Sequence, residues 1–162
     1  MGLETVHPEI LPRLNKRMTL DRFRSAARFL REARIALRAF VLAGLPFASD
    51  EESLEWACRS IEFAFDCGAS AVAVIPTRTG NGALDALANG GEFRPPRVAT
   101  LEAALDFGLG LRRGRVFADL WDLGRFHTCV RCSDARASRM RAMNLGQVPL
   151  PRISCDSCGG LS

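Results

Sequence analysis

Short apolar runs alternate along the chain with longer segments in which apolar residues recur at helical spacing. The apolar runs predict four strands, at residues 2–6, 35–43, 71–76 and 115–120. The amphipathic segments predict helices over residues 19–33, 49–68, 83–88, 100–111 and 133–144. Because strands and helices alternate, we expect right-handed crossovers and a parallel sheet.

Capping residues and one long apolar run make these elements more specific. Thr19 is placed to cap the first long helix, and Ser49 forms a capping box with Glu52 at the start of the second. Gly68 follows that helix, at a position where a left-handed residue is favoured. The run Ile35–Ala43 is apolar on both faces apart from one arginine, which predicts a strand buried on both faces.

Length and composition indicate a globular protein of one domain, or of one domain with a small appendage. The chain has 162 residues, of which 48% are hydrophobic and 25% charged, as in a globular domain. We place a boundary near residue 122, between an α/β core at 1–122 and a cysteine-rich appendage at 123–162. No apolar run reaches the about 18 residues of a membrane span, so we expect a soluble, cytoplasmic protein without membrane contact. The net charge of +4 comes almost wholly from arginine and does not by itself indicate a nucleic-acid partner.

Four of the six cysteines form two matched pairs, Cys129-x2-Cys132 and Cys155-x2-Cys158. A two-residue gap lets one tight turn direct two sulfurs at the same point, so two pairs can complete an all-thiolate metal shell. The spacing is compatible with zinc or with a [4Fe–4S] cluster. A set of three cysteines with His127 is a further alternative. The other two cysteines, Cys58 and Cys67, are expected to be small core side chains.

The helix predicted between the two cysteine pairs is basic. We expect Met140 and Met143 to pack inward and Arg136, Arg139 and Arg141 to lie on the other face. Such a face suits contact with the tRNA backbone, but it is equally typical of a solvated helix surface.

In a parallel α/β sheet the ligand site lies beyond the carboxyl ends of the strands. The segments at these positions are Glu4-Thr5, Gly44-Leu45-Pro46, Pro76–Gly82 and Asp119–Asp122. A glycine there allows close approach of a ligand, and the carboxylate of Glu4 suits a diol such as a ribose. From the residues alone, the Gly-Leu-Pro segment is more readily explained as an ordinary turn after a strand.

Three segments in series resemble the second half of the radical S-adenosylmethionine core. They are Gly2-Leu3-Glu4-Thr5, Leu14-Asn15-Lys16-Arg17-Met18-Thr19 and Phe40-Val41-Leu42-Ala43-Gly44-Leu45-Pro46. The branch is that of elongator-type acetyltransferases, methylthiotransferases and oxygen-independent coproporphyrinogen oxidases. The chain looks most like archaeosine-biosynthesis radical enzymes and their bacterial relatives, which also carry a Pro-Thr-Arg-x-Gly-Asn-Gly segment and C-terminal cysteines. The resemblance covers residues 2 to about 120.

The resemblance implies a partial parallel β/α barrel that binds S-adenosylmethionine. Glu4 would contact the ribose, and Lys16 or its neighbour Arg17 would meet the methionine carboxylate of the cosubstrate. Residues near the adenine would be Leu42, Gly44, Leu45, Ile75 and Pro76.

The chain departs from the family at the cluster motif, since no C-x3-C-x2-C occurs in it. The resemblance therefore implies a fragment or split half of a radical enzyme, with a separately encoded N-terminal half and a tRNA base or similar nucleoside as substrate. Such a chain should not react alone, because the cluster supplies the electron that cleaves the sulfonium, and its uncovered strand edge should favour self-association. The alternatives are a non-catalytic metal knuckle that binds nucleic acid or a partner protein, and a remnant without function.

Overall fold

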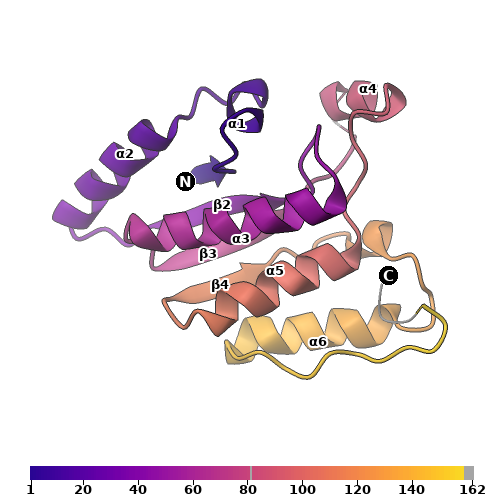
Figure 1. Ribbon diagram of the computed structural model, residues 1–162. Coiled ribbons are helices and arrows are strands. Elements are labelled where there is room, and N and C mark those ends of the chain that lie inside the picture. Colours follow the sequence, from indigo (N-terminus) through magenta and orange to yellow (C-terminus); the bar gives the residue numbers. More distant parts are fainter. Residues whose placement is uncertain (81, 159–162) are drawn as a thin grey trace.

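The computed structural model describes residues 1–80 and 82–158, so Asn81 of the predicted Pro76–Gly82 loop and the last four residues lie outside it (Figure 1). Its four strands form one sheet: β1 (Gly2–Glu4), β2 (Arg38–Ala43), β3 (Ala71–Pro76) and β4 (Arg115–Ala118). Every neighbouring pair is parallel, and the strand order β1-β2-β3-β4 follows the chain without reversal. The predicted parallel α/β sheet with flanking helices is confirmed.

Helices connect and follow the strands. Their bounds are α1 Ile10–Arg13, α2 Leu20–Glu32, α3 Asp50–Asp66, α4 Ala83–Asn89, α5 Val98–Gly110, the 3-10 helix η1 Leu123–Phe126, and α6 Ser133–Gly146. The predicted caps form: Thr19 accepts a hydrogen bond from the Arg22 backbone, and Ser49 and Glu52 make a reciprocal capping box. Gly68 follows α3 with a φ of +91°, as a left-handed terminal residue should. No helix in the described ranges combines the length and apolar character needed to cross a bilayer.

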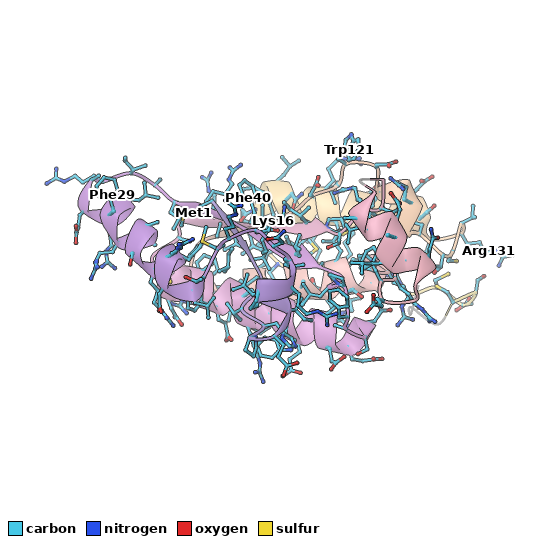
Figure 2. The ribbon with its side chains drawn as sticks, turned by 90° about the horizontal axis from the view of Figure 1, so that it is seen from above. Met1, Lys16, Phe29, Phe40, Trp121 and Arg131 are labelled. Carbon is cyan, nitrogen blue, oxygen red and sulfur yellow. The ribbon has the colours of Figure 1, made fainter. Side chains whose placement is uncertain are left out.

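One face of the sheet is covered and the other is open. Alternate residues point to the covered face, where α3 and α5 lie along the strands (Figure 1) and bury the side chains of Ala39, Val41, Ala43, Val72, Val74, Val116 and Ala118. The opposite side chains are exposed or only half-buried: Arg38, Phe40, Leu42, Ala73, Ile75 and Phe117. We call this second surface the open face; Phe40 lies on it and is 37% exposed (Figure 2).

The prediction that residues 35–43 form a strand buried on both faces is therefore wrong. Ile35 precedes the strand and is exposed, and β2 alternates between buried and accessible side chains. The reason is topological: right-handed crossovers in an unreversed strand order all fall on the same side of a sheet. The first strand is also shorter than predicted, because Glu4 adopts a left-handed φ of +65° and Thr5 turns back to donate to the Leu3 carbonyl.

The two edges of the sheet differ. Beyond β4, the side-chain amide of Gln147 both accepts from and donates to the backbone of Val116, and that of Asn144 does the same with Ala118. Helix α6 thus takes the place of a further strand and closes this edge. At the other edge, β1 pairs with β2 and with no other strand of the described ranges.

Helix α6 also joins the segment after residue 122 to the hydrophobic core. Met140 and Met143 are fully buried, as predicted, and they belong to the same core cluster as Leu123 and Phe126. The division of the chain near residue 122 stays a prediction.

Removal of the two amides should weaken this closure. In the double variant Asn144→Ala/Gln147→Ala, the β4 edge loses its partners, so we expect the free energy of unfolding to fall by about 1–3 kcal/mol. Urea denaturation measures this change, and sedimentation velocity should show more association, because an unpaired edge recruits other chains. Arg141→Ala/Leu145→Ala, on the exposed side of α6, is the matched control. Equal unfolding midpoints for the two double variants would contradict the role of the amides.

Candidate functional site

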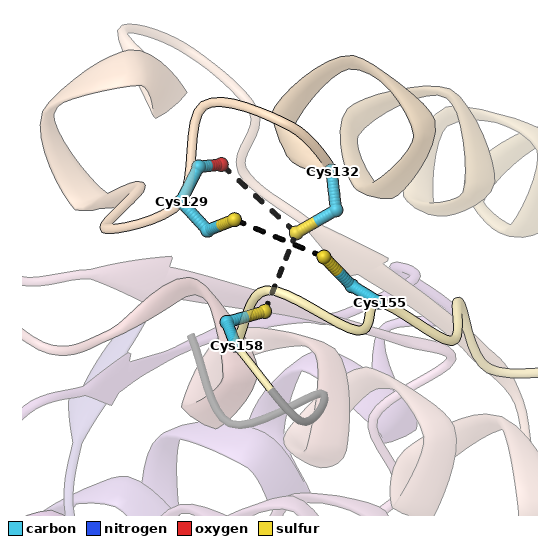
Figure 3. Close-up of side chains that lie close together, drawn as sticks. All are labelled: Cys129, Cys132, Cys155 and Cys158. Atoms are coloured by element: carbon cyan, nitrogen blue, oxygen red, sulfur yellow. Dashed lines mark hydrogen bonds between the residues drawn. The ribbon is translucent and has the colours of Figure 1, made fainter.

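The four predicted cysteines converge in space (Figure 3). The sulfur atoms of Cys129, Cys132, Cys155 and Cys158 all lie within 4.8 Å of one another. The Sγ–Sγ distance is 3.8 Å between Cys129 and Cys155 and 3.7 Å between Cys132 and Cys158. Four thiolates at such distances can hold a metal ion, so the predicted group of close C-terminal cysteines is confirmed. We call this group the cysteine centre.

Local structure brings the two pairs together. The first pair lies in the turn that leads into α6, with the buried Cys132 as the N-cap residue of that helix. The second pair lies in a turn where the Cys158 backbone donates to the Cys155 carbonyl. Arg131 donates to Ser157 across the gap, so the two turns also contact each other outside the sulfurs. His127 is not among the converging side chains of the described residues, and burial lowers its pKa.

Burial raises the pKa of Cys129, Cys58 and Cys67. Desolvation raises the pKa of Cys129, and the neighbouring thiols of Cys132 and Cys155 add to the shift, although backbone hydrogen bonds oppose it. A metal must therefore displace a proton that this thiol holds firmly, so binding should strengthen as pH rises. Cys58 and Cys67 lie on α3 and at its end, half-buried and away from the centre. Burial raises the pKa of Cys58 to about 11 and also raises that of Cys67, so both are poor nucleophiles.

The prediction of an outward basic face on α6 is wrong for two of its three arginines. Arg136 and Arg139 are only 2% and 5% exposed, whereas Arg141 is exposed. Both buried arginines form ion pairs with Glu102 of α5, and Arg139 also pairs with Asp106. Burial raises the pKa of Glu102, and the two guanidinium groups oppose this shift. Glu102 and Asp106 lie one turn apart on an otherwise apolar helix. This acidic pair is the sequence feature that could have predicted buried partners for the arginines.

A second candidate site lies at the carboxyl ends of β1, β2 and β3. Five of the eight residues named from the resemblance line one cavity of about 450 Å³: Glu4, Lys16, Leu42, Ile75 and Pro76. We call it the strand-end cavity. Its volume lies within the range of about 300–1,000 Å³ typical of small-molecule sites. Thr77 and Arg78, from the predicted Pro76–Gly82 segment, also line it, and so do residues that the sequence reasoning missed, among them Arg13 and Phe47.

Charged groups of both signs border this cavity. A Cβ on Gly2 would lie 2.5 Å from Oε1 of Glu4, so the missing side chain leaves room for that carboxylate. Lys16 (Figure 2) makes no ion pair within the described ranges and is exposed. Arg13 lies over the Phe47 ring, 3.3 Å from its centroid. The lining of the cavity thus includes one carboxylate, that of Glu4, and three cations, Arg13, Lys16 and Arg78. Arg13 also pairs with Glu92, at 3.8 Å.

Two buried polar atoms on cavity residues have no hydrogen-bond partner among the described residues, Oγ1 of Thr77 and Nε of Arg78. Arg78 is held in place by Asp119, at 2.9 Å, and by the carbonyl oxygens of Pro76 and Trp121. Buried polar atoms usually have partners, and those left without one at a cavity are candidates for ligand contacts. Asp119 thus orients an arginine, and Asp122 pairs with Arg125.

Three predicted contact residues do not line the cavity. Leu45 is 1% exposed, and its backbone donates to Ser53. Gly44 has a φ of +82°, and a Cβ there would lie 2.6 Å from Cδ of Pro96, so this glycine is required by packing. Arg17 lines a separate hollow between α1 and α2, where its carbonyl accepts from Arg22. Of the two neighbouring cations, only Lys16 therefore faces the strand-end cavity.

The fold and the two sites define a parallel α/β protein with a cavity at its strand ends and a four-cysteine centre. No family model and no curated protein matches the chain. What the two sites do must therefore be inferred from the residues of this chain.

Metal binding should depend on the four converging cysteines alone. One equivalent of Zn²⁺ should raise the melting midpoint, because a ligand that binds only the folded state stabilises it by about 2.7 kcal/mol at 100 times its dissociation constant. Cys132→Ser should abolish this effect, and Cys58→Ser, the matched control, should retain it. Differential scanning calorimetry with and without zinc measures both. Zinc stabilisation that survives in Cys132→Ser would contradict the site.

Proposed function

We propose that the chain is one half of a radical S-adenosylmethionine enzyme. In this proposal it binds the cosubstrate in the strand-end cavity, and a partner part outside these residues supplies the catalytic iron–sulfur cluster. The observation that carries the proposal is that Glu4, Lys16, Leu42, Ile75 and Pro76 line one cavity at the carboxyl ends of parallel strands. That is where sheets of this kind bind ligands.

The residues of the cavity fit the chemical groups of S-adenosylmethionine. The Glu4 carboxylate would accept hydrogen bonds from the ribose hydroxyls, and the Lys16 ammonium would pair with the methionine carboxylate. Leu42, Ile75 and Pro76 provide an apolar wall for the adenine ring. The buried Thr77 hydroxyl has no hydrogen-bond partner among the described residues, which makes it a candidate contact for the ligand.

The electron for the reaction has to come from outside this chain. S-adenosylmethionine, when bound and reduced, is the source of the radical that begins catalysis, and no C-x3-C-x2-C loop is present here to deliver the electron. This chain would bind and orient the cosubstrate. The resemblance points to a tRNA base or another nucleoside-like molecule as the substrate.

The sheet supports the proposed partner. Parallel sheets in proteins are covered on both faces, but Phe40, Leu42 and Phe117 leave an accessible apolar surface on the open face. The β4 edge is closed by α6, whereas β1 can accept a further strand. Additional β/α units joined at β1 would extend the sheet toward the proposed partial barrel and cover this face.

At the cysteine centre we infer a single zinc ion with a structural role. A tetrahedral ion with Zn–S bonds of about 2.3 Å sets its sulfurs about 3.8 Å apart, which agrees with the 3.8 Å and 3.7 Å separations. A [4Fe–4S] cluster places several iron atoms between its thiolates, so its ligands must lie farther apart.

The alternative function is a non-catalytic metal knuckle that binds nucleic acid or a partner protein. The convergence of the four cysteines favours it. Its nucleic-acid form is weakened, because Arg136 and Arg139 are buried in ion pairs and are not available to phosphate groups.

The cosubstrate proposal predicts different effects for two neighbouring cations. Lys16→Met should weaken binding of S-adenosylmethionine by about tenfold or more, because a hydrogen bond to a charged group contributes about 1.5–3 kcal/mol. Arg17→Met should leave binding unchanged. Equilibrium dialysis with labelled S-adenosylmethionine measures both, and Glu4→Gln against Glu9→Gln repeats the comparison for the carboxylate. Equal losses for Lys16→Met and Arg17→Met, or no binding by the unaltered chain, would reject the proposed site.

The metal proposal predicts a colourless protein. After anaerobic purification, elemental analysis should find one zinc per chain and no acid-labile sulfide. The visible spectrum should lack the absorption near roughly 400 nm that thiolate-bound iron–sulfur clusters give. Stoichiometric iron and sulfide with that band would instead assign an auxiliary cluster to the centre.

A further inference from the structure

A row of buried charges connects α5 to the cysteine centre. Asp106 pairs with Arg139 at 2.6 Å, Arg139 with Glu102 at 3.4 Å, and Glu102 with Arg136 at 2.5 Å. The signs alternate along the row, and the side chains of both arginines are 3% exposed. At the end of the row farthest from Asp106, the Arg136 side chain hydrogen-bonds to the sulfur of Cys132, and Cys158 lies close by.

Helix geometry places Arg136 against the centre. Cys132 is the N-cap residue of α6, and Arg136 follows four residues later, so the two share one face of the first turn. The Arg136 backbone donates to the Cys132 carbonyl at 2.9 Å.

We propose that Arg136 is a positioning residue for the metal–thiolate centre: it donates to the Cys132 sulfur, offsets the negative charge of the bound thiolates and ties the centre to Glu102. Four thiolates around a divalent ion carry a net charge of −2, which is costly to hold beside buried side chains unless a cation compensates it. Hydrogen-bond donors around a metal site stabilise the deprotonated ligands in this way.

Arg139 offers a matched control. It lies on the same helix, is buried to the same extent and contacts the same Glu102, but its remaining partners are Asp106 and the carbonyl oxygens of Leu150 and Pro151. A role in packing alone would make the two arginines equivalent. A role in charge compensation predicts that only the loss of Arg136 weakens metal binding.

This inference rests on the proposed metal centre, so the test begins with the unaltered full chain. Co²⁺ titration, followed by competition with Zn²⁺, gives the metal affinity and the thiolate-to-cobalt charge-transfer band. Arg136→Met should weaken the affinity by about 10–100-fold and move the band to longer wavelength, because a thiolate that loses a donor is oxidised more easily. Arg139→Met should change the affinity by less than about threefold and leave the band in place.

Two further variants separate charge from folding. Arg136→Lys keeps the positive charge and should recover most of the affinity, so it carries the test if Arg136→Met does not fold. Glu102→Gln removes the competing anion and should leave the affinity unchanged or raise it, although it breaks the same ion pair. Equal losses in Arg136→Met and Arg139→Met, or a loss in Glu102→Gln as large as in Arg136→Met, would overturn the inference. Failure of the unaltered chain to bind Co²⁺ or Zn²⁺ would overturn the metal centre itself.

Discussion

The handedness of its crossovers determines the architecture of this protein. Four parallel strands in unreversed order, joined by right-handed connections, place the helices that cross between them on one side of the sheet. The covered face becomes the core, and the other face keeps apolar side chains such as Phe40 and Phe117 within reach of solvent. The same topology gathers the loops after β1, β2 and β3 at one end, so residues as distant in sequence as Glu4 and Pro76 line a single cavity.

Polar side chains as well as apolar ones attach the C-terminal segment to this sheet. Asn144 and Gln147 hydrogen-bond along β4, and Arg136 and Arg139 form ion pairs with α5. Buried ion pairs contribute little net stability but specify one arrangement, because a misplaced helix would leave charges unpaired. The cysteine centre holds the two ends of the segment together. Helix α6 therefore carries contacts to the cysteine centre, to α5 and to β4.

Local patterns in the sequence were sufficient to predict the parts that depend on neighbours along the chain. The caps at Thr19 and Ser49, the parallel strands and the convergence of two Cys-x2-Cys turns each follow from a short pattern. The errors concern partners distant in sequence. The sequence predicts outward arginines on α6, but Glu102 of α5 lies opposite two of them. Spacing cannot show which charges will meet across two helices.

On the proposed function, the open face and the strand-end cavity have one explanation in common. Leu42 and Ile75 line the cavity and also belong to the open face, so a ligand bound there would lie beside solvent-accessible surface. A radical intermediate has to be shielded from water and from side reactions, which requires a closed site. In the proposed function this chain would orient the cosubstrate without surrounding it. The partner that brings the cluster would then have two roles. It would supply the electron, and it would cover the side of the cavity that this chain leaves open.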